Sequence, residues 1–327
     1  PWRMTRDPYS ILVSEIMLQQ TQVDRVIPAY SRFLMVFPTI QNLAAATPMA
    51  VIQAWHGLGY YRRAVRLHQL AQIITDEMQG RIPDSTTELI KLPGVGRYTA
   101  AAVACFAFDE QVAAFDVNTS RVLHRLLGVG ARSKSLLPTE EFRGAIQTMI
   151  PKGRAASWNQ ALMDVGSKFC KSSSPVCSAC PLTKVCEHSN KASELETPSN
   201  EDGNPGTLQT PIPFKGSARF FRGRIIRILS GLEPSEHIRI DKLLKGINVD
   251  LDNDLKLTQA AFIGLLTAME TEGLIYKIKS RRLFIQKWRI YCFLFHEHSP
   301  PIPLHYQPCF LSRKSLRSLN HQLPSKK

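Results

Sequence analysis

The segment TTELIKLPGVGRYTAAAVACFAFDEQVAAFDVNTSRV, residues 86–122, constrains the fold more than any other stretch of this chain. It predicts a short helix, a tight turn at residues 92–96 and a second helix that begins at Arg97. A loop follows, and Asp116 then opens a third helix as its N-terminal capping residue. The sequence therefore predicts two helices joined by a tight hairpin, with a third helix close behind.

The turn itself favours a bound anion. Pro93 cannot continue the first helix, and Gly94 and Gly96 can adopt the positive φ that a hairpin between helices needs. Two glycines beside a helix start expose backbone N–H groups, and a phosphodiester is the anion that we expect there. Any hairpin between helices can use such a turn, so this signal is modest by itself.

Composition supports the same class of partner. The chain has 327 residues and a net charge of +14, which suits a polyanion, although many basic proteins only carry solvated lysines. No run of eighteen apolar residues and no signal peptide are found, so we expect a soluble, intracellular protein. The start at Pro1 and Trp2, without Met, suggests a fragment whose first helix is missing.

The first catalytic candidate is Glu15. Asp7 and Pro8 predict a helix start, and the helix is expected over residues 9–27. Glu15 falls on the apolar stripe of this helix, one turn after Ile11. Burial there would raise the pKa of the carboxyl, which suits a general acid near neutral pH. The alternative is an ordinary exposed glutamate at the edge of the helix.

A glycine-rich turn followed by a basic helix supplies a second candidate. Tyr60 and Tyr61 are flanked by Arg62, Arg63 and Arg66. Adjacent tyrosines are most often core residues. Beside arginines at a turn, they can instead wedge into a base stack next to phosphates.

Four cysteines indicate a metal site. Cys170, Cys177, Cys180 and Cys186 lie within seventeen residues, which favours one metal centre over a disulfide framework. Zinc is the metal that a four-cysteine group most generally binds. Cys105 lies in an apolar helix and is expected to be a core residue.

The chain after residue 188 changes character. Residues 189–216 are rich in Ser, Pro, Gly, Asn and acidic residues, which predicts a flexible linker. Residues 217–286 predict three helices and a hairpin, a winged-helix-like module that either contacts DNA or only packs. Residues 287–327 form a basic tail that we expect to be irregular.

Residues 1–188 resemble the endonuclease III superfamily of helix-hairpin-helix DNA glycosylases, and within it the MutY-type adenine glycosylases. The resemblance rests on six segments: PWR (1–3), SEIMLQQTQV (14–23), GLGYYRRA (57–64), LPGVGRYTA (92–100), DVNTSRV (116–122) and WNQALMDVGSKFC (158–170). It implies an all-α fold, with a six-helix barrel domain and an iron–sulfur helical domain. The cysteine loop at 170–186 would then hold a [4Fe–4S] cluster that fixes the loop against DNA.

The resemblance also implies a reaction. Glu15 would protonate the flipped adenine, Asp116 would stabilise positive charge on the deoxyribose, and Tyr98 and Asn118 would hold the sugar and the carboxylates. Superfamily members that cut the strand carry lysine at the place of Tyr98, and a phenol cannot form an imine. We therefore expect a monofunctional enzyme that leaves an abasic site.

The other implied contacts fall into three groups. They are the adenine pocket (Trp2, Arg3, Leu18, Gln160), the residues that enter the vacated stack (Gln20, Tyr60) and the phosphate-binding amides (Gly94, Val95, Gly96). The expected partner is double-stranded DNA with adenine mispaired with 8-oxoguanine or guanine, no membrane is expected to be involved, and the protein is expected to be a monomer.

Two departures from the family pattern are visible. Val117 and Ser120 stand where the family usually has glycine and often has lysine. Residues 217–285 lack the strand pattern of the Nudix-like domain that reads 8-oxoguanine in well-known members. The alternatives are a glycosylase for another mispaired base, such as thymine opposite guanine, and a non-catalytic DNA-binding protein on the same scaffold.

Overall fold

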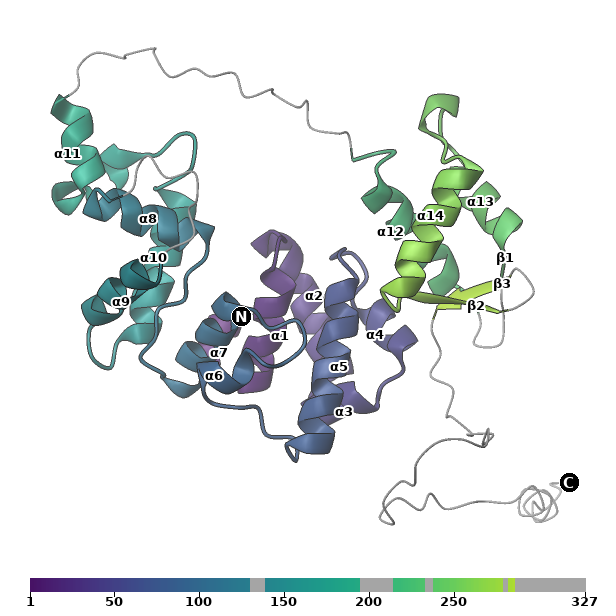
Figure 1. Ribbon diagram of the computed structural model, residues 1–327, viewed down its shortest axis with the longest axis horizontal. Helices are drawn as coiled ribbons and strands as arrows, with labels where there is room; N and C mark the ends of the chain where they lie inside the picture. Colours follow the sequence, from purple (N-terminus) through teal and green to yellow (C-terminus); the bar gives the residue numbers. More distant parts are fainter. Residues whose placement is uncertain (130–138, 195–213, 233–237, 279–281, 286–327) are drawn as a thin grey trace, which may run out of the picture. The chain divides into compact units, whose positions relative to one another are not determined.

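The computed structural model describes residues 1–129, 139–194, 214–232, 238–278 and 282–285 (Figure 1). The chain divides into one unit, Pro1–Trp288, and a second, Arg289–Lys327. The whole predicted tail, residues 287–327, lies outside the described residues. Among the helices described, none is both long and apolar enough to span a bilayer.

The described residues up to 194 form helices without strands, as the sequence predicts. The elements are η1 (Trp2–Met4), α1 (Pro8–Leu18), α2 (Val23–Val36), α3 (Ile40–Ala45), α4 (Pro48–Ala54), α5 (Arg62–Glu77), α6 (Thr86–Leu89), α7 (Arg97–Phe108), α8 (Val117–Leu127), α9 (Glu140–Met149), α10 (Ala155–Lys168), η2 (Cys177–Ala179), η3 (Thr183–Val185) and α11 (Glu187–Glu194). Residues 189–194, predicted as the start of the flexible linker, are helical instead, because α11 continues to Glu194. Most of the remaining linker, 195–213, lies outside the described residues.

The single helix predicted over residues 9–27 is wrong, because the structure has two helices there. Asp7 caps α1 as expected, with its side chain accepting a hydrogen bond from the Ser10 amide. Helix α1 ends at Leu18, and Gln20 then adopts a left-handed conformation with φ of +53°. The last carbonyl groups of α1 accept hydrogen bonds from the Arg63 guanidinium of α5 rather than from helix amides. A tertiary contact therefore ends the helix.

The predicted hairpin is present between α6 and α7. Gly94 has a φ of +83°, as predicted, and the Val95 amide donates to the Leu92 carbonyl at 3.2 Å to close the turn. The prediction of a positive φ at Gly96 is wrong. Gly96 is the N-cap of α7 and has a φ of −92°, because a cap residue takes an extended conformation.

Two hydrophobic cores meet beside α7. Helix α7 packs against α1 and α6, and its alanines at 100–104 and Cys105 are buried, so the neighbouring backbones approach closely. One core contains the buried side chains of α1–α7 together with those of the C-terminal segment from Phe221 to Ile275. The other lies around Phe115, Leu123, Ile146 and Val165 from the segments that follow α7. The predicted catalytic residues lie on elements of both cores.

The C-terminal module follows the predicted order of three helices and a hairpin. Its elements are α12 (Ala218–Ser230), β1 (Ile238–Arg239), α13 (Ile240–Asn248), η4 (Asn253–Leu255), α14 (Gln259–Thr271), β2 (Ile275–Ile278) and β3 (Arg282–Ile285). The strands form an antiparallel sheet in the order β1-β3-β2, with Ile275 opposite Ile285 and Ile238 opposite Leu283. Helix, strand, two helices and a two-stranded wing are the order of a winged-helix fold.

Candidate active site

Glu15 is a buried carboxyl, as the sequence predicts. Its side chain is 5% exposed, and its Oε2 atom has no hydrogen-bond partner within the described residues. Burial raises the pKa of Glu15 to about 7, against the opposing effect of the Tyr98 hydroxyl, while Asp116 raises it further and Arg3 lowers it. A carboxyl with this pKa is protonated in a large fraction of molecules near neutral pH, and it can therefore donate a proton there.

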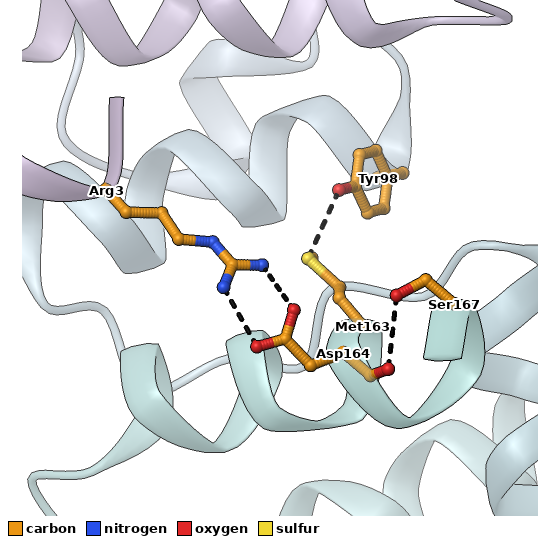
Figure 2. Close-up of polar contacts among 5 residues, drawn as sticks. All are labelled: Arg3, Tyr98, Met163, Asp164 and Ser167. Atoms are coloured by element: carbon orange, nitrogen blue, oxygen red, sulfur yellow. Dashed lines mark hydrogen bonds and ion pairs between the residues drawn. The ribbon is translucent and has the colours of Figure 1, made fainter. Parts of the chain in front are cut away.

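Tyr98 stands in the first turn of α7, beside Glu15. Its hydroxyl contacts the Met163 Sδ atom of α10 at 3.8 Å (Figure 2) and also hydrogen-bonds with the Glu15 carboxyl. The hydroxyl has one proton, so it donates to one of these two acceptors at a time. Burial raises the pKa of Tyr98 above its usual value, so the phenol keeps its proton. Tyr98 is therefore a neutral donor next to the buried acid.

Asp116 caps α8 and also belongs to the site. Its Oδ1 atom accepts from the amides of Asn118 and Thr119, at 3.0 and 2.7 Å, and the Thr119 hydroxyl accepts from the Asp116 amide at 2.9 Å. Its Oδ2 atom accepts from the Asn118 side-chain amide at 3.0 Å. The predicted capping role of Asp116 is thus confirmed, and its charge also raises the pKa of Glu15.

Arg3 forms a two-pronged ion pair with Asp164 of α10. The two N–O distances are 3.0 and 2.9 Å, and Figure 2 shows the guanidinium facing the carboxylate across the space between η1 and α10. The pair lowers the pKa of Asp164. Sequence reasoning missed Asp164. Its position four residues after Gln160, on the same face of α10, was the available signal.

The other predicted pocket residues are half-buried. Leu18 is the last residue of α1, and Gln160 lies on α10. Trp2 lies in η1, where its ring packs edge-on against Tyr30 with ring centroids 5.5 Å apart. Their contacts with a base remain predictions.

Gln20 and Tyr60, predicted to enter the base stack, share two uncommon properties. Both are exposed, Tyr60 by 38%, and both have a positive φ, +53° and +47°. Non-glycine residues in this conformation store backbone strain, which is frequent at functional sites. Tyr61, by contrast, is buried in the core, and the role in the base stack stays a prediction for Tyr60.

The hairpin supplies fewer free amides than predicted. The Val95 amide donates to the Leu92 carbonyl within the turn, and the predicted contact of Val95 with a phosphate stays a prediction. Within the described residues, the amides of Gly94 and Gly96 keep no internal acceptor. These two groups and the first turn of α7 are the donors that remain for an anion.

The four cysteines of the loop gather around one cavity. Cys170, Cys177, Cys180 and Cys186 have free thiols and line the same hollow with side chains of α8. Across the described residues, no group of three or more His, Cys, Asp or Glu side chains is placed to hold a single metal ion. Cys105 is separate and buried, where its Sγ atom accepts from the Asn159 amide at 3.3 Å.

Two arginines of α8 hold the cysteine loop, and sequence reasoning missed both. Arg125 donates to the Cys170 Sγ atom at 3.4 Å. Arg121 donates to the Cys170 carbonyl at 2.8 Å and to the Asn118 side-chain oxygen at 3.1 Å. The spacing of Asn118, Arg121 and Arg125 along one helix face was the signal in the sequence.

The hairpin, the helix opened by Asp116 and the buried acid beside them together define a helix-hairpin-helix protein of the DNA-repair class. Residues 13–144 match the family described as HhH-GPD superfamily base excision DNA repair protein. Over these residues the chain has the sequence pattern of that superfamily.

Known proteins of two kinds are similar to this chain. The human adenine DNA glycosylase is 40% identical over 195 residues, which cover 57% of this chain and 36% of that protein. The Mycolicibacterium smegmatis adenine DNA glycosylase is 41% identical over 184 residues, or 56% of this chain and 62% of that protein. The match thus spans less than two thirds of either relative.

The structure of a thermostable thymine-DNA glycosylase aligns with a TM-score of 0.55 and 32% identity, covering 58% of this chain and 88% of that one. A non-covalent endonuclease III–DNA complex aligns with a TM-score of 0.52 and 27% identity, covering 59% and 89%.

Proposed function

We propose that this chain is a monofunctional DNA glycosylase that removes adenine mispaired with 8-oxoguanine or guanine in double-stranded DNA. The observation that carries the proposal is the buried Glu15, with a pKa raised to about 7, next to Tyr98 and the Asp116 helix start. The names of the similar relatives support adenine as the base.

The side chains divide the reaction between them. Protonated Glu15 donates its proton to a ring nitrogen of the extruded adenine, so the electron pair of the N-glycosidic bond leaves with a neutral base. The carboxylate of Asp116 faces the positive charge that develops on the deoxyribose and stabilises it. Water then adds to the sugar carbon, and its proton returns to the ionised Glu15. The products are free adenine and an abasic site.

Tyr98 limits the reaction to base removal. A phenol has no amine that can form an imine with the opened sugar, so the strand stays intact until alkali breaks it. With its proton retained by burial, Tyr98 donates a hydrogen bond to Glu15 or to the sugar. Asn118 holds Asp116 from the same helix turn.

The loop at 170–186 is proposed to hold a [4Fe–4S] cluster. Cys170, Cys177, Cys180 and Cys186 fit a multi-atom cluster better than a single zinc ion, because they surround one cavity without closing on one point. The cluster would supply a rigid link between the four thiolates rather than a step of the reaction. Lys168, which ends α10, would face the DNA backbone beside it.

The domain division remains part of the proposal. It places the glycosylase domain at 1–188, the linker at 189–216, the winged-helix-like module at 217–286 and the tail at 287–327. Residues 217–285 form this module rather than a Nudix-like domain, and we propose that the module or the glycosylase domain contacts 8-oxoguanine.

Single-turnover cleavage tests the proposal. Duplexes carry adenine opposite 8-oxoguanine, guanine or cytosine, or thymine opposite guanine, and alkali is added after the reaction. We expect alkali-dependent cleavage at adenine, fastest opposite 8-oxoguanine, and none in Glu15→Gln, which should still bind the duplex. Cleavage only at thymine would replace adenine as the substrate. Full activity of Glu15→Gln would refute the role of the acid.

A further inference from the structure

Arg63 of α5 is a buried guanidinium whose acceptors belong to the end of α1 and to two loops. It is 9% exposed, and within the described residues no carboxylate pairs with it. Its Nη1 and Nη2 atoms donate at 2.6–3.4 Å to the carbonyl groups of Ile16, Met17, Gln19, Leu58 and Gly59 and to the Thr21 hydroxyl. Burial lowers the pKa of Arg63 to about 10, so it stays charged near neutral pH.

The two loops that Arg63 joins are those that carry Gln20 and Tyr60. The first loop runs from α1 to α2, and the second from α4 to α5. The Arg63 guanidinium lies 5.4 Å from the ring centroid of Tyr60 and equally far from that of Trp55. Trp55 in turn donates to the Gly59 carbonyl at 3.1 Å. Arg63 thus contacts both loops that carry the exposed, left-handed residues. The Tyr60 side chain has a second charged neighbour, Arg219, which donates to its hydroxyl at 3.1 Å.

We propose that Arg63 is a positioning residue, which keeps Gln20 and Tyr60 ready to enter the space that an extruded base leaves in the DNA stack. This role rests on the proposed function. Glutamine and tyrosine in the left-handed conformation carry backbone strain, so their loops need contacts that offset it in the free protein. The hydrogen bonds from Arg63 are such contacts, and they exist before DNA binds.

Lysine should not replace Arg63 in this role. The planar guanidinium directs Nη1 to the end of α1 and its loop and Nη2 to both loops, whereas an ammonium group is a single donor centre on a flexible stem. Arg63→Lys keeps the charge and removes the two-sided geometry. A role in phosphate binding would survive this change, and a positioning role would not.

The probe is a duplex with a tetrahydrofuran abasic site opposite guanine, compared with the same duplex fully paired. The Kd for the paired duplex divided by the Kd for the abasic duplex measures how well the protein fills a vacated position. We expect the wild type to prefer the abasic duplex and Arg63→Lys to lose roughly tenfold or more of that preference. The matched control is Ile74→Val, a buried change of the same helix that lowers stability and should leave the ratio unchanged.

A double variant separates positioning from general loosening. If Arg63 acts through Tyr60, then Arg63→Lys should lower the ratio in the wild type and much less in a Tyr60→Ala background. Equal effects in both backgrounds, or a wild-type ratio kept by Arg63→Lys, would overturn the proposal. Adenine excision is scored separately. A wild type that excises no adenine contradicts the proposed function, while the abasic-site ratio still tests Arg63.

Discussion

Glu15→Gln should make the protein more stable at high pH while abolishing its activity. Burial raises the pKa of Glu15 from 4.5 to about 7. A pKa raised on folding means that the folded state holds its proton more tightly than the unfolded state. Stability from this group is therefore fully present below about pH 4.5, and it is lost progressively as the pH rises to 7 and slightly beyond. At pH 9 the loss amounts to roughly 3 kcal/mol, at about 1.4 kcal/mol for each pKa unit.

Glutamine cannot ionise, so Glu15→Gln escapes this loss. The side-chain amide of the variant would lie in the pocket in which the Glu15 Oε2 atom has no partner among the described residues. An amide left without a hydrogen bond there lowers the free energy of unfolding by about 1 kcal/mol at every pH. The variant should thus be slightly less stable than the wild type at pH 4.5 and about 2 kcal/mol more stable at pH 9. Between pH 4.5 and pH 9 the difference in unfolding free energy between variant and wild type should change by roughly 3 kcal/mol. The cost of the amide is the same at both pH values, so it does not affect this change.

Urea unfolding of both proteins at pH 4.5, 7 and 9 measures the difference, and the exposed Glu77→Gln of α5 is the control. Titrating groups that do not interact with Glu15 cancel between wild type and variant. A difference that stays constant from pH 4.5 to 9 would refute a raised pKa at Glu15. In the wild type, single-turnover excision should also fall as the pH rises above about 7, because the acid is then ionised.

Three further changes have defined outcomes. Asp164→Asn should release Arg3 and slow adenine excision about tenfold, with the thermal midpoint nearly unchanged, since exposed ion pairs contribute about 0.2–1 kcal/mol; an unchanged rate would contradict a role for the pair. Gly94→Ala should destabilise the protein by more than about 1 kcal/mol in urea and weaken DNA binding, because φ is +83° and the added Cβ would lie 3.0 Å from the Arg66 Cβ. Cys177→Ser should remove the visible absorbance of an iron–sulfur protein, and a colourless wild type that contains zinc would contradict the cluster.

Local pattern accounts for the parts of this structure that were predicted correctly. The apolar spacing around Glu15 predicted its burial and the direction of its pKa shift, and Asp116 followed by a helical segment predicted a cap. The break after Leu18 was not predictable in this way, because the group that ends α1 is Arg63, more than forty residues further along. The face that Asp164 shares with Gln160 was a signal for its place in the site, but its pairing with Arg3, 161 residues away, was not predictable for the same reason. Contacts between distant elements leave no periodic trace in the sequence.

The contacts of Arg121 explain how the cysteine loop can matter for a reaction in which it takes no part. Arg121 holds the Cys170 carbonyl at 2.8 Å and the Gly166 carbonyl at 3.1 Å, and it also donates to the Asn118 side chain. The side-chain amide of Asn118 in turn donates to the Oδ2 atom of Asp116, the carboxylate oxygen that does not cap the helix. A loop that loses its shape would therefore disturb Asp116, the carboxylate proposed to face the sugar, through a chain of three hydrogen bonds. Because this route is mechanical, a loss of the cysteine ligands should slow base removal without any change of redox state.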